Sequence, residues 1–136
     1  MMADRGAIEN VLASWALGYD QREPDRMARC FTAGAVMTLS IGGTQTMGPY
    51  VGHAQVMKHF TDHHLIQTDQ RRHVISNVVV DSESDTEATV FSNLTLVVVD
   101  QGTTQVRATG IYRDRFVLDD GAWKIAERFL RLDSHY

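Results

Sequence analysis

The sequence predicts an α+β fold in which helices come first and long antiparallel strands follow. Apolar residues recur at helical spacing in the first half of the chain, whereas four long β-branched and apolar runs follow Gln67. This order is typical of a curved sheet whose concave face is covered by helices. Since 136 residues allow one hydrophobic core, we expect residues 1–136 to form a single domain.

The first helix is predicted to follow Asp4, which is a suitable N-cap residue. Its apolar positions have the spacing of a helix with one buried face: Ile8, Val11, Leu12, Trp15, Ala16 and Tyr19. This spacing places Tyr19 on the buried face at the last turn, with Asp20 beside it at the edge of the interior.

Two more helices are predicted before the long strands. Pro24 favours the first turn of a short helix that extends to Phe31 and ends at residues 32–34. A third helix is expected over His53–Leu65, because Val56, Met57, Phe60 and His64 have helical spacing.

The strand predictions begin with a hairpin. Ala35–Ile41 and Thr44–Met47 are joined by the turn signal Gly42-Gly43, and a loop containing Tyr50 is expected over Gly48–Gly52. The main sheet is expected to contain four strands separated by polar turns: Arg71–Asp81, Thr86–Asp100, Thr104–Leu118 and Ala122–Asp133.

Composition excludes several classes of function. The 13 basic and 17 acidic residues give a formal net charge of -4, and no basic stripe is present that could follow a nucleic-acid backbone. The single cysteine, Cys30, cannot form an internal disulfide, and the N-terminal residues lack the apolar stretch of a signal peptide. The longest aliphatic run, Leu96–Val99, is too short to span a membrane. We therefore expect a soluble, cytoplasmic protein without nucleic-acid or membrane partners.

The ordered set of motifs resembles one superfamily over nearly the whole chain. The motifs are Tyr19-Asp20 with Asp25-Arg26-Met27, the Gly48–Gly52 loop before a helix, Arg72–Asn77, Gly110–Asp114 and Asp120–Ile125. In this order they resemble the nuclear transport factor 2-like superfamily, and within it the SnoaL-like branch that contains scytalone dehydratase and the small subunits of ring-hydroxylating dioxygenases. The resemblance implies a cone-shaped, cystatin-like fold: a curved, mostly antiparallel sheet and three helices around one apolar cavity. It also implies a homodimer or homotrimer.

The resemblance places a catalytic pair at Asp20 and His73. The chemistry of these residues supports the same interpretation, because a neutral histidine, with an ordinary pKa of about 6.5, can accept a proton from carbon near neutral pH. A buried carboxylate on its other nitrogen would fix the tautomer and stabilise the imidazolium. The alternatives are a core histidine bonded to a backbone carbonyl and a solvated carboxylate at the helix end.

Other residues are candidates for substrate contacts. Strand alternation puts His73 and Asn77 on one face, and the resemblance favours this face as the concave one. Tyr19 is the leading proton donor, with packing on the helix face as its alternative role. The candidate cavity residues are Trp15, Tyr50, Phe60, Asn77, Ser92 and Tyr112. Relative to scytalone dehydratase, Ser92 replaces a second active-site histidine, and Tyr112 replaces an inward asparagine.

Other reactive side chains are assigned simpler roles. His59 and His63 have metal-ligand spacing, but no third ligand is evident, so we predict no metal site. Cys30 is expected to be small core filler. Arg128 and Arg131 fall on opposite faces of the last strand. An ion pair at a subunit interface is favoured for either, and contact with a substrate anion near the cavity mouth is the alternative.

The sequence therefore predicts a cofactor-independent lyase or isomerase that acts on a small hydrophobic ring compound of the polyketide, steroid or aromatic-catabolite kind. His73 would abstract a proton, Asp20 would orient it, and the outcome would be elimination or migration of a double bond. The alternative is a non-catalytic module for assembly or ligand binding, as the resemblance to dioxygenase small subunits implies.

Overall fold

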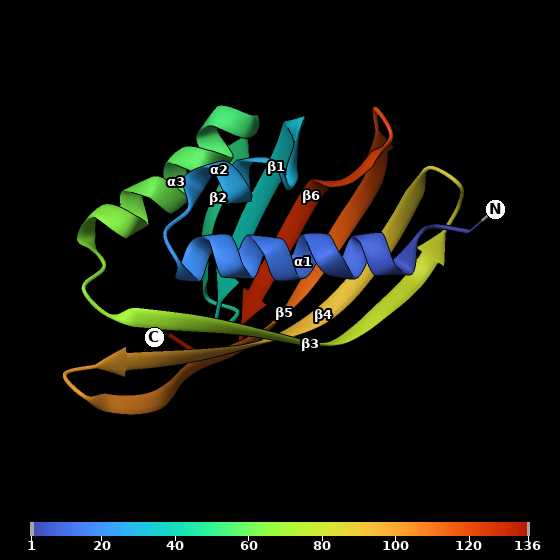
Figure 1. Cartoon of the computed structure of the whole chain (residues 1–136). Helices are drawn as coiled ribbons and strands as arrows, with labels where there is room; N and C mark the ends of the chain where they lie inside the picture. Colours follow the sequence, from blue (N-terminus) through green and yellow to red (C-terminus); the bar gives the residue numbers. More distant parts are fainter. Residues whose placement is uncertain (1, 136) are drawn as a thin grey trace.

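The computed structural model describes residues 2–135, and this part of the chain forms three helices and six strands. In chain order the elements are α1 (Arg5–Asp20), α2 (Pro24–Ala28), β1 (Phe31–Ile41), β2 (Gln45–Val51), α3 (His53–Ile66), β3 (Gln70–Glu83), β4 (Glu87–Asp100), β5 (Thr103–Asp119) and β6 (Ala122–Leu132). The strands pair in the order β2–β1–β6–β5–β4–β3, and α1 and α3 cover the concave face of this curved sheet (Figure 1).

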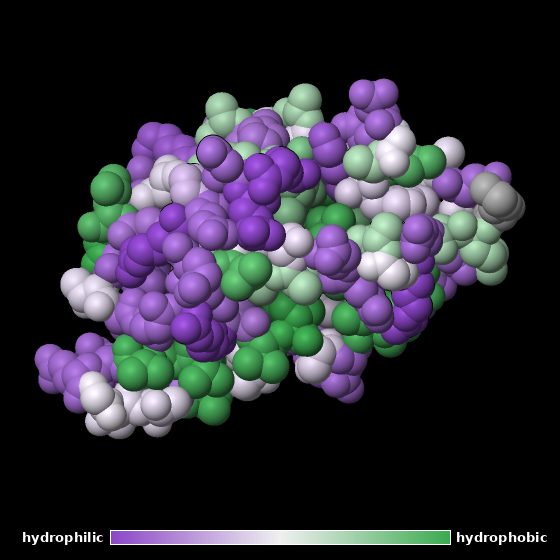
Figure 2. Space-filling view, in the orientation of Figure 1, coloured by the Kyte–Doolittle hydropathy of each residue, from purple (hydrophilic) through white to green (hydrophobic). Residues whose placement is uncertain are grey.

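The helix predictions are confirmed, with small differences at the ends. Asp4 caps α1 by accepting a 3.0 Å hydrogen bond from the backbone N–H of Ala7. The predicted stripe is buried, including Ile8, Leu12 and Trp15, and packs toward the sheet. On the side of the molecule that the helices cover, hydrophilic side chains dominate the helix surfaces, and hydrophobic ones gather along the strands below α1 (Figure 2).

The sheet is larger than predicted because the N-terminal hairpin joins it. β1 begins at Phe31, within the segment predicted to end a helix, and runs parallel to β6. β2 continues through the predicted loop, so Tyr50 lies on a strand rather than in a loop. Parallel pairing joins segments that are far apart in the sequence, and a local hairpin signal does not reveal it.

The inward-facing positions of the strands form the core together with the helices. Val90, Leu94, Phe116 and Ile125 are almost fully buried there. One end of this core, below α1 and α3, is left partly open and forms the cavity described below. Within residues 2–135, no helix combines the length and apolar character that crossing a bilayer requires.

Candidate active site

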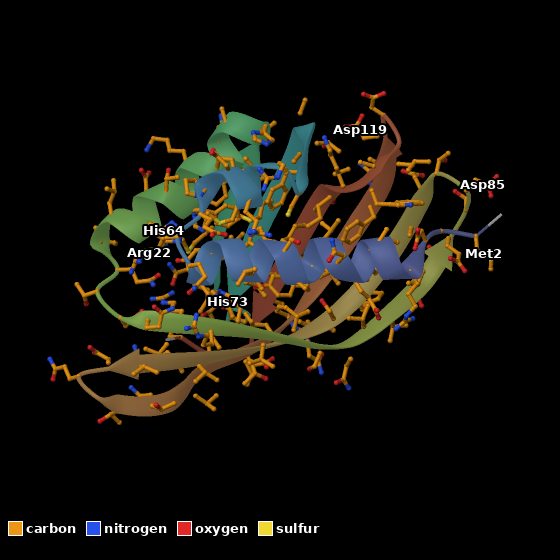
Figure 3. All side chains as sticks on the ribbon, in the orientation of Figure 1. Met2, Arg22, His64, His73, Asp85 and Asp119 are labelled. Carbon is orange, nitrogen blue, oxygen red and sulfur yellow. The ribbon has the colours of Figure 1, made fainter. Side chains whose placement is uncertain are left out.

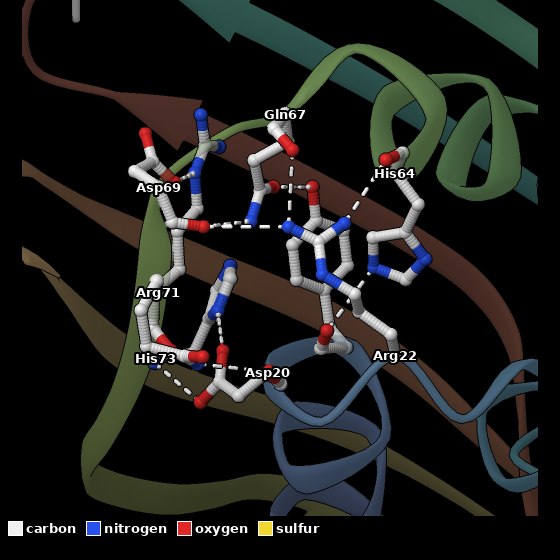
Figure 4. A network of polar contacts seen from close by, with 9 residues as sticks. Asp20, Arg22, His64, Gln67, Asp69, Arg71 and His73 are labelled. Atoms are coloured by element: carbon white, nitrogen blue, oxygen red, sulfur yellow. Dashed lines mark hydrogen bonds and ion pairs between the residues drawn. The ribbon is translucent and has the colours of Figure 1, made fainter. Parts of the chain in front are cut away.

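The end of α1 places a carboxylate directly against the histidine of β3. Asp20 Oδ1 lies 2.6 Å from His73 Nδ1, and Asp20 Oδ2 accepts a 2.9 Å hydrogen bond from the backbone N–H of His73 (Figure 4). Both side chains are 8% exposed. Because both carboxylate oxygens bind one residue, the ring and the backbone of His73 are fixed together.

The position of β3 in the sheet explains this arrangement. β3 is an edge strand, and an edge strand presents backbone groups that have no partner strand. The C-terminal end of α1 lies beside this edge, and Asp20 supplies the acceptor for the N–H of His73. Asp20 can do so because it is the last residue of the helix and follows the buried Tyr19.

This contact also determines which nitrogen of His73 can act as a base. A carboxylate can only accept hydrogen bonds, so Nδ1 carries the proton in the neutral ring and Nε2 keeps the free lone pair. His73 is part of the cavity wall, whereas Asp20 lies behind it. The basic nitrogen is therefore on the side of the ring that meets the cavity.

The cavity has an aromatic and aliphatic wall. The cavity volume is about 60 Å³, and the unfilled space counted out into the open solvent at its mouth is about 570 Å³. Trp15, Tyr19, Phe60 and Tyr112 lie on its wall, at the positions expected from the sequence. The ring centroids of Trp15 and Tyr19 lie 5.3 and 4.8 Å from that of His73. Their apolar surface limits the access of water to the base.

A buried arginine also contributes to the cavity wall. Arg128 is 1% exposed and donates two hydrogen bonds to Asp114, of 2.8 and 3.0 Å. The third guanidinium nitrogen, Nη1, is buried and has no hydrogen-bond partner among residues 2–135. The guanidinium also lies over the rings of Tyr112 and Trp15, 4.0 and 4.8 Å from their centroids. Burial alone would lower the pKa of Arg128, but the adjacent carboxylate outweighs this and raises it, so the guanidinium stays charged.

This ion pair replaces the expected interface role of Arg128. Asp114 and Arg128 face each other across β5 and β6, both at inward positions. Their partnership depends on the register of two strands, which neither residue reveals alone. The alternation of Asp114 with the inward Tyr112 and Phe116 is the signal that could have identified it.

Tyr19 is engaged differently from the prediction that it donates to substrate. Its hydroxyl donates a 2.9 Å hydrogen bond to Oε1 of Gln67, in the segment between α3 and β3. To donate to a substrate, Tyr19 would have to give up this bond. Nη1 of Arg128, on a side chain that borders the cavity, has no hydrogen-bond partner among residues 2–135 and would give up no such bond.

Asn77 was predicted to face the cavity, and this prediction is wrong. The register between β3 and β4 shifts between Ser76 and Val79, which marks a β-bulge, and Asn77 has a φ of 54°. The extra residue reverses the alternation of the strand. Val78 and Val80 therefore pack against the core, and Asn77 is exposed. Asparagine adopts positive φ more readily than most residues. An asparagine within a predicted strand was therefore a signal that the alternation could break there.

Two other predicted contacts lie outside the cavity wall. Tyr50 packs on the ring of His59, with 4.6 Å between the centroids, and borders a shallow groove on the outer side of α3. Ser92 is buried on the inner face opposite Tyr112, and its hydroxyl has no hydrogen-bond partner in the described part of the chain. Neither residue lines the cavity.

Two histidines of α3 form the wall between the cavity and this groove. The rings of His59 and His63 lie 4.3 Å apart, and both residues border both spaces. Burial and the neighbouring His63 lower the pKa of His59 to about 4, against a smaller opposite effect of Asp62. His59 is therefore neutral at pH 7.

The lowered pKa of His59 predicts a loss of stability in acid. Between about pH 6.5 and 4 the unfolded chain binds a proton at this residue and the folded protein does not, so the free energy of unfolding falls as the pH falls. After allowance for solvent screening, we expect a contribution of about 1–2 kcal/mol. Urea unfolding at pH 7 and pH 4.5 should show a smaller difference in His59→Gln than in the wild type. Replacement of the exposed His135 by glutamine is the control, and equal pH dependence in all three proteins would contradict the prediction.

His63, His64 and Cys30 have other partners or surroundings. Nδ1–H of His63 donates to the backbone oxygen of His59, and Nε2–H of His64 donates to that of Tyr19. Among residues 2–135, no group of three or more His, Cys, Asp or Glu side chains is arranged to hold a metal ion. Cys30 is buried, as expected of core filler, and burial raises the pKa of its thiol to about 11.

Comparison with known proteins places this chain in a family. Residues 1–129 match the SnoaL-like domain. The chain belongs to the SnoaL-like family. A comparison with curated proteins finds no significant match.

Solved structures show the same fold as this SnoaL-like chain. A proposed scytalone dehydratase from Novosphingobium aromaticivorans has a TM-score of 0.76 and 24% identity, covering 96% of this chain and 87% of its own. The beta subunit of a proposed aromatic-ring-hydroxylating dioxygenase from the same organism has a TM-score of 0.82 and 15% identity, covering 97% and 90%. An NTF2-like protein with a cystatin-like fold, also from that organism, has a TM-score of 0.78 and 17% identity, covering 95% and 81%. The predicted nuclear transport factor 2-like fold is thereby confirmed.

Proposed function

We propose that this SnoaL-like protein is a cofactor-independent lyase or isomerase that removes a carbon-bound proton from a small hydrophobic ring compound. The observation that carries the proposal is the Asp20–His73 pair, in which the carboxylate holds Nδ1–H and the other side of the ring meets an apolar cavity. An imidazole that a carboxylate orients beside an apolar cavity is the arrangement of a general base. The similarity to a proposed scytalone dehydratase supports the same reaction class.

The reaction begins with transfer of a proton from the carbon beside a carbonyl group to Nε2 of His73. The electrons of that C–H bond form a C=C bond, and the carbonyl electrons move to oxygen, which gives an enolate. Nη1 of Arg128, which is unpaired within residues 2–135, donates a hydrogen bond to this oxygen. Asp20 stabilises the imidazolium that has formed.

The enolate then follows one of two paths. In an elimination the carbonyl re-forms and a hydroxyl group on the next carbon leaves as water, with the proton that His73 carried. In an isomerisation the same proton is returned to a different carbon. Both paths restore neutral His73, so no cofactor is required.

Proton exchange tests this proposal before the physiological substrate is identified. The protein is incubated in D₂O with a panel of one-ring and two-ring cyclic ketones, some with a hydroxyl group β to the carbonyl. We expect deuterium to enter the α position of at least one ketone, as followed by proton NMR, and ultraviolet absorption of an enone to appear where elimination follows. Exchange no faster than with the His73→Gln variant for every ketone would contradict the proposal.

The second candidate is a non-catalytic module for assembly or ligand binding. The structural similarity to a dioxygenase beta subunit favours it. Such a module needs no oriented base, and its partner or ligand would bind equally well to the His73→Gln variant. The proton exchange experiment therefore distinguishes the two candidates.

We also propose that the chain forms a homodimer or homotrimer through the outer face of the sheet. Val74, Val79, Val106 and Phe129 face outward there and are 36–62% exposed. Burial of this apolar surface would stabilise an association. Light scattering at micromolar concentration should give at least twice the mass of the 15.3 kDa chain. Phe129→Glu should lower that mass and the control Leu65→Glu on α3 should not, whereas a 15.3 kDa wild type would contradict the proposal.

A further inference from the structure

The residue two positions after the end of α1 has an unusual backbone conformation. Arg22 follows the helix with a φ of 56°, its N–H donates to the carbonyl of Tyr19, and the N–H of Glu23 donates to that of Gly18. This is the Schellman arrangement, in which glycine is the usual residue at the position of Arg22. A residue with a Cβ is strained there, so a compensating role of the side chain is expected.

The side chain of Arg22 compensates for this strain by binding the end of α3 and the residues that connect α3 to β3. Its guanidinium donates hydrogen bonds to the backbone oxygens of His64, Gln67 and Asp69, of 2.9, 3.1 and 3.3 Å (Figure 4). The oxygens of His64 and Gln67 belong to the C-terminal end of α3, where carbonyls lack partners within the helix and the helix dipole is negative. A fixed positive charge is well suited to this place.

The end of α3 and the start of β3 bind back to the end of α1. Nε2–H of His64 donates to the carbonyl of Tyr19 at 3.1 Å, and the amide of Gln70 donates to the carbonyl of Asp20 at 2.9 Å. Burial lowers the pKa of His64, and the charge of Arg22 acts in the same direction, so His64 serves as a neutral donor. Two helix C-termini thus cap each other, each with a side chain from the other segment.

These contacts surround the Asp20–His73 pair. Arg22 lies two residues after Asp20, and the last carbonyl that it binds, that of Asp69, lies four residues before His73. Arg22, His64 and His73 lie around the same end of α1 in Figure 3. The 2.6 Å bond between Asp20 and His73 joins the end of α1 to β3. The contacts of residues 64–70 with the end of α1 flank this bond on the chain side that precedes His73.

We propose that Arg22 is a positioning residue that holds Asp20 and His73 in register by joining the ends of α1 and α3. Its relevance to catalysis rests on the proposed function, whereas its effect on the geometry of the pair does not. Arg22 is exposed and touches no substrate space, so it acts through the backbone carbonyls that it binds.

The variant Arg22→Gly separates this role from stability of the fold. Glycine is favoured at this backbone position, so the helix end is preserved while the three side-chain hydrogen bonds are lost. In the wild type, Nδ1–H of His73 should give a slowly exchanging, strongly downfield proton resonance with nitrogen shifts of a single tautomer. In Arg22→Gly we expect this resonance to broaden or vanish, the nitrogen shifts to indicate mixed tautomers, and backbone amides of residues 67–73 to exchange about tenfold faster or more.

Two further variants complete the experiment. Arg22→Lys keeps the charge but cannot span three carbonyls, so we expect an intermediate effect on the His73 resonance. If Arg22→Gly does not fold, this variant tests the positioning role in its place. Arg72→Gln is the matched control, because Arg72 also joins the α1 end to β3, by a 3.0 Å bond to the side chain of Gln21. It should leave the His73 resonance unchanged.

The outcomes separate the two proposals. A folded Arg22→Gly protein with an unchanged Nδ1–H resonance and unchanged nitrogen shifts would overturn the positioning role. An equal effect of Arg72→Gln would overturn it too, because any loss of contact at this helix end would then suffice. A changed resonance in a protein that exchanges no ketone proton would support the positioning role and refute the proposed function.

Discussion

Replacing His73 by alanine is expected to lower turnover of a responsive ketone by about two to four orders of magnitude, the usual contribution of a positioned general base. The fold should survive, because the backbone N–H of residue 73 still binds Oδ2 of Asp20. The values of kcat and KM are measured beside the thermal unfolding curve. Added imidazole should restore part of the rate in the alanine variant, since it can occupy the space of the lost ring.

Glutamine at position 73 is the matched control. It is similar in size and can donate a hydrogen bond to Asp20, but it cannot accept a proton from carbon, so its loss should equal that of alanine. Near-wild-type turnover in either variant would refute the mechanism.

Asp20→Asn tests whether the two residues act as one unit. The amide has one accepting oxygen where the carboxylate has two, and its NH₂ group, if placed against Nδ1, favours the tautomer in which Nε2 carries the proton. The expected loss is again about two to four orders of magnitude. In the double variant with His73→Ala the losses should be far from additive. Fully additive losses would show that both residues matter but not as a pair.

The sequence was sufficient for the features that depend on local periodicity. The stripe of the first helix placed Tyr19 and Asp20 at its buried end, and the order of motifs directed attention to His73. Asp20 and His73 meet where the resemblance implied, within 2.6 Å. A helix end and a strand start can be located from spacing, because each repeats its own period over several turns or residues.

The features that were missed depend on pairing between distant segments or on a local break in a pattern. The partnership of Asp114 with Arg128 requires the register of β5 and β6. The single extra residue of the bulge turned Asn77 out of the cavity, although the alternation before it was correct. The role of Arg22 follows from a backbone conformation that its residue type does not suggest.

Arg128→Met is expected to lower the free energy of unfolding by about 3–5 kcal/mol, because it leaves the fully buried Asp114 without its partner. A typical domain has only about 5–15 kcal/mol in total, so the loss should be evident in urea unfolding. Replacement of both residues, in Arg128→Met with Asp114→Val, removes the unpaired charge and should return most of that stability.

The double variant separates the structural role of the ion pair from the chemical role of Nη1. If Arg128 donates to the enolate oxygen, the double variant should be stable yet slower by about two to three orders of magnitude, the usual effect of losing one such donor. The measurement is kcat/KM for the exchanging ketone, beside the free energy of unfolding of each variant. Full activity in a stable double variant would show that the charge serves the fold alone. A single variant as stable as the wild type would show instead that Asp114 is not held as a buried carboxylate, because an unpaired charge at that depth cannot be tolerated without cost.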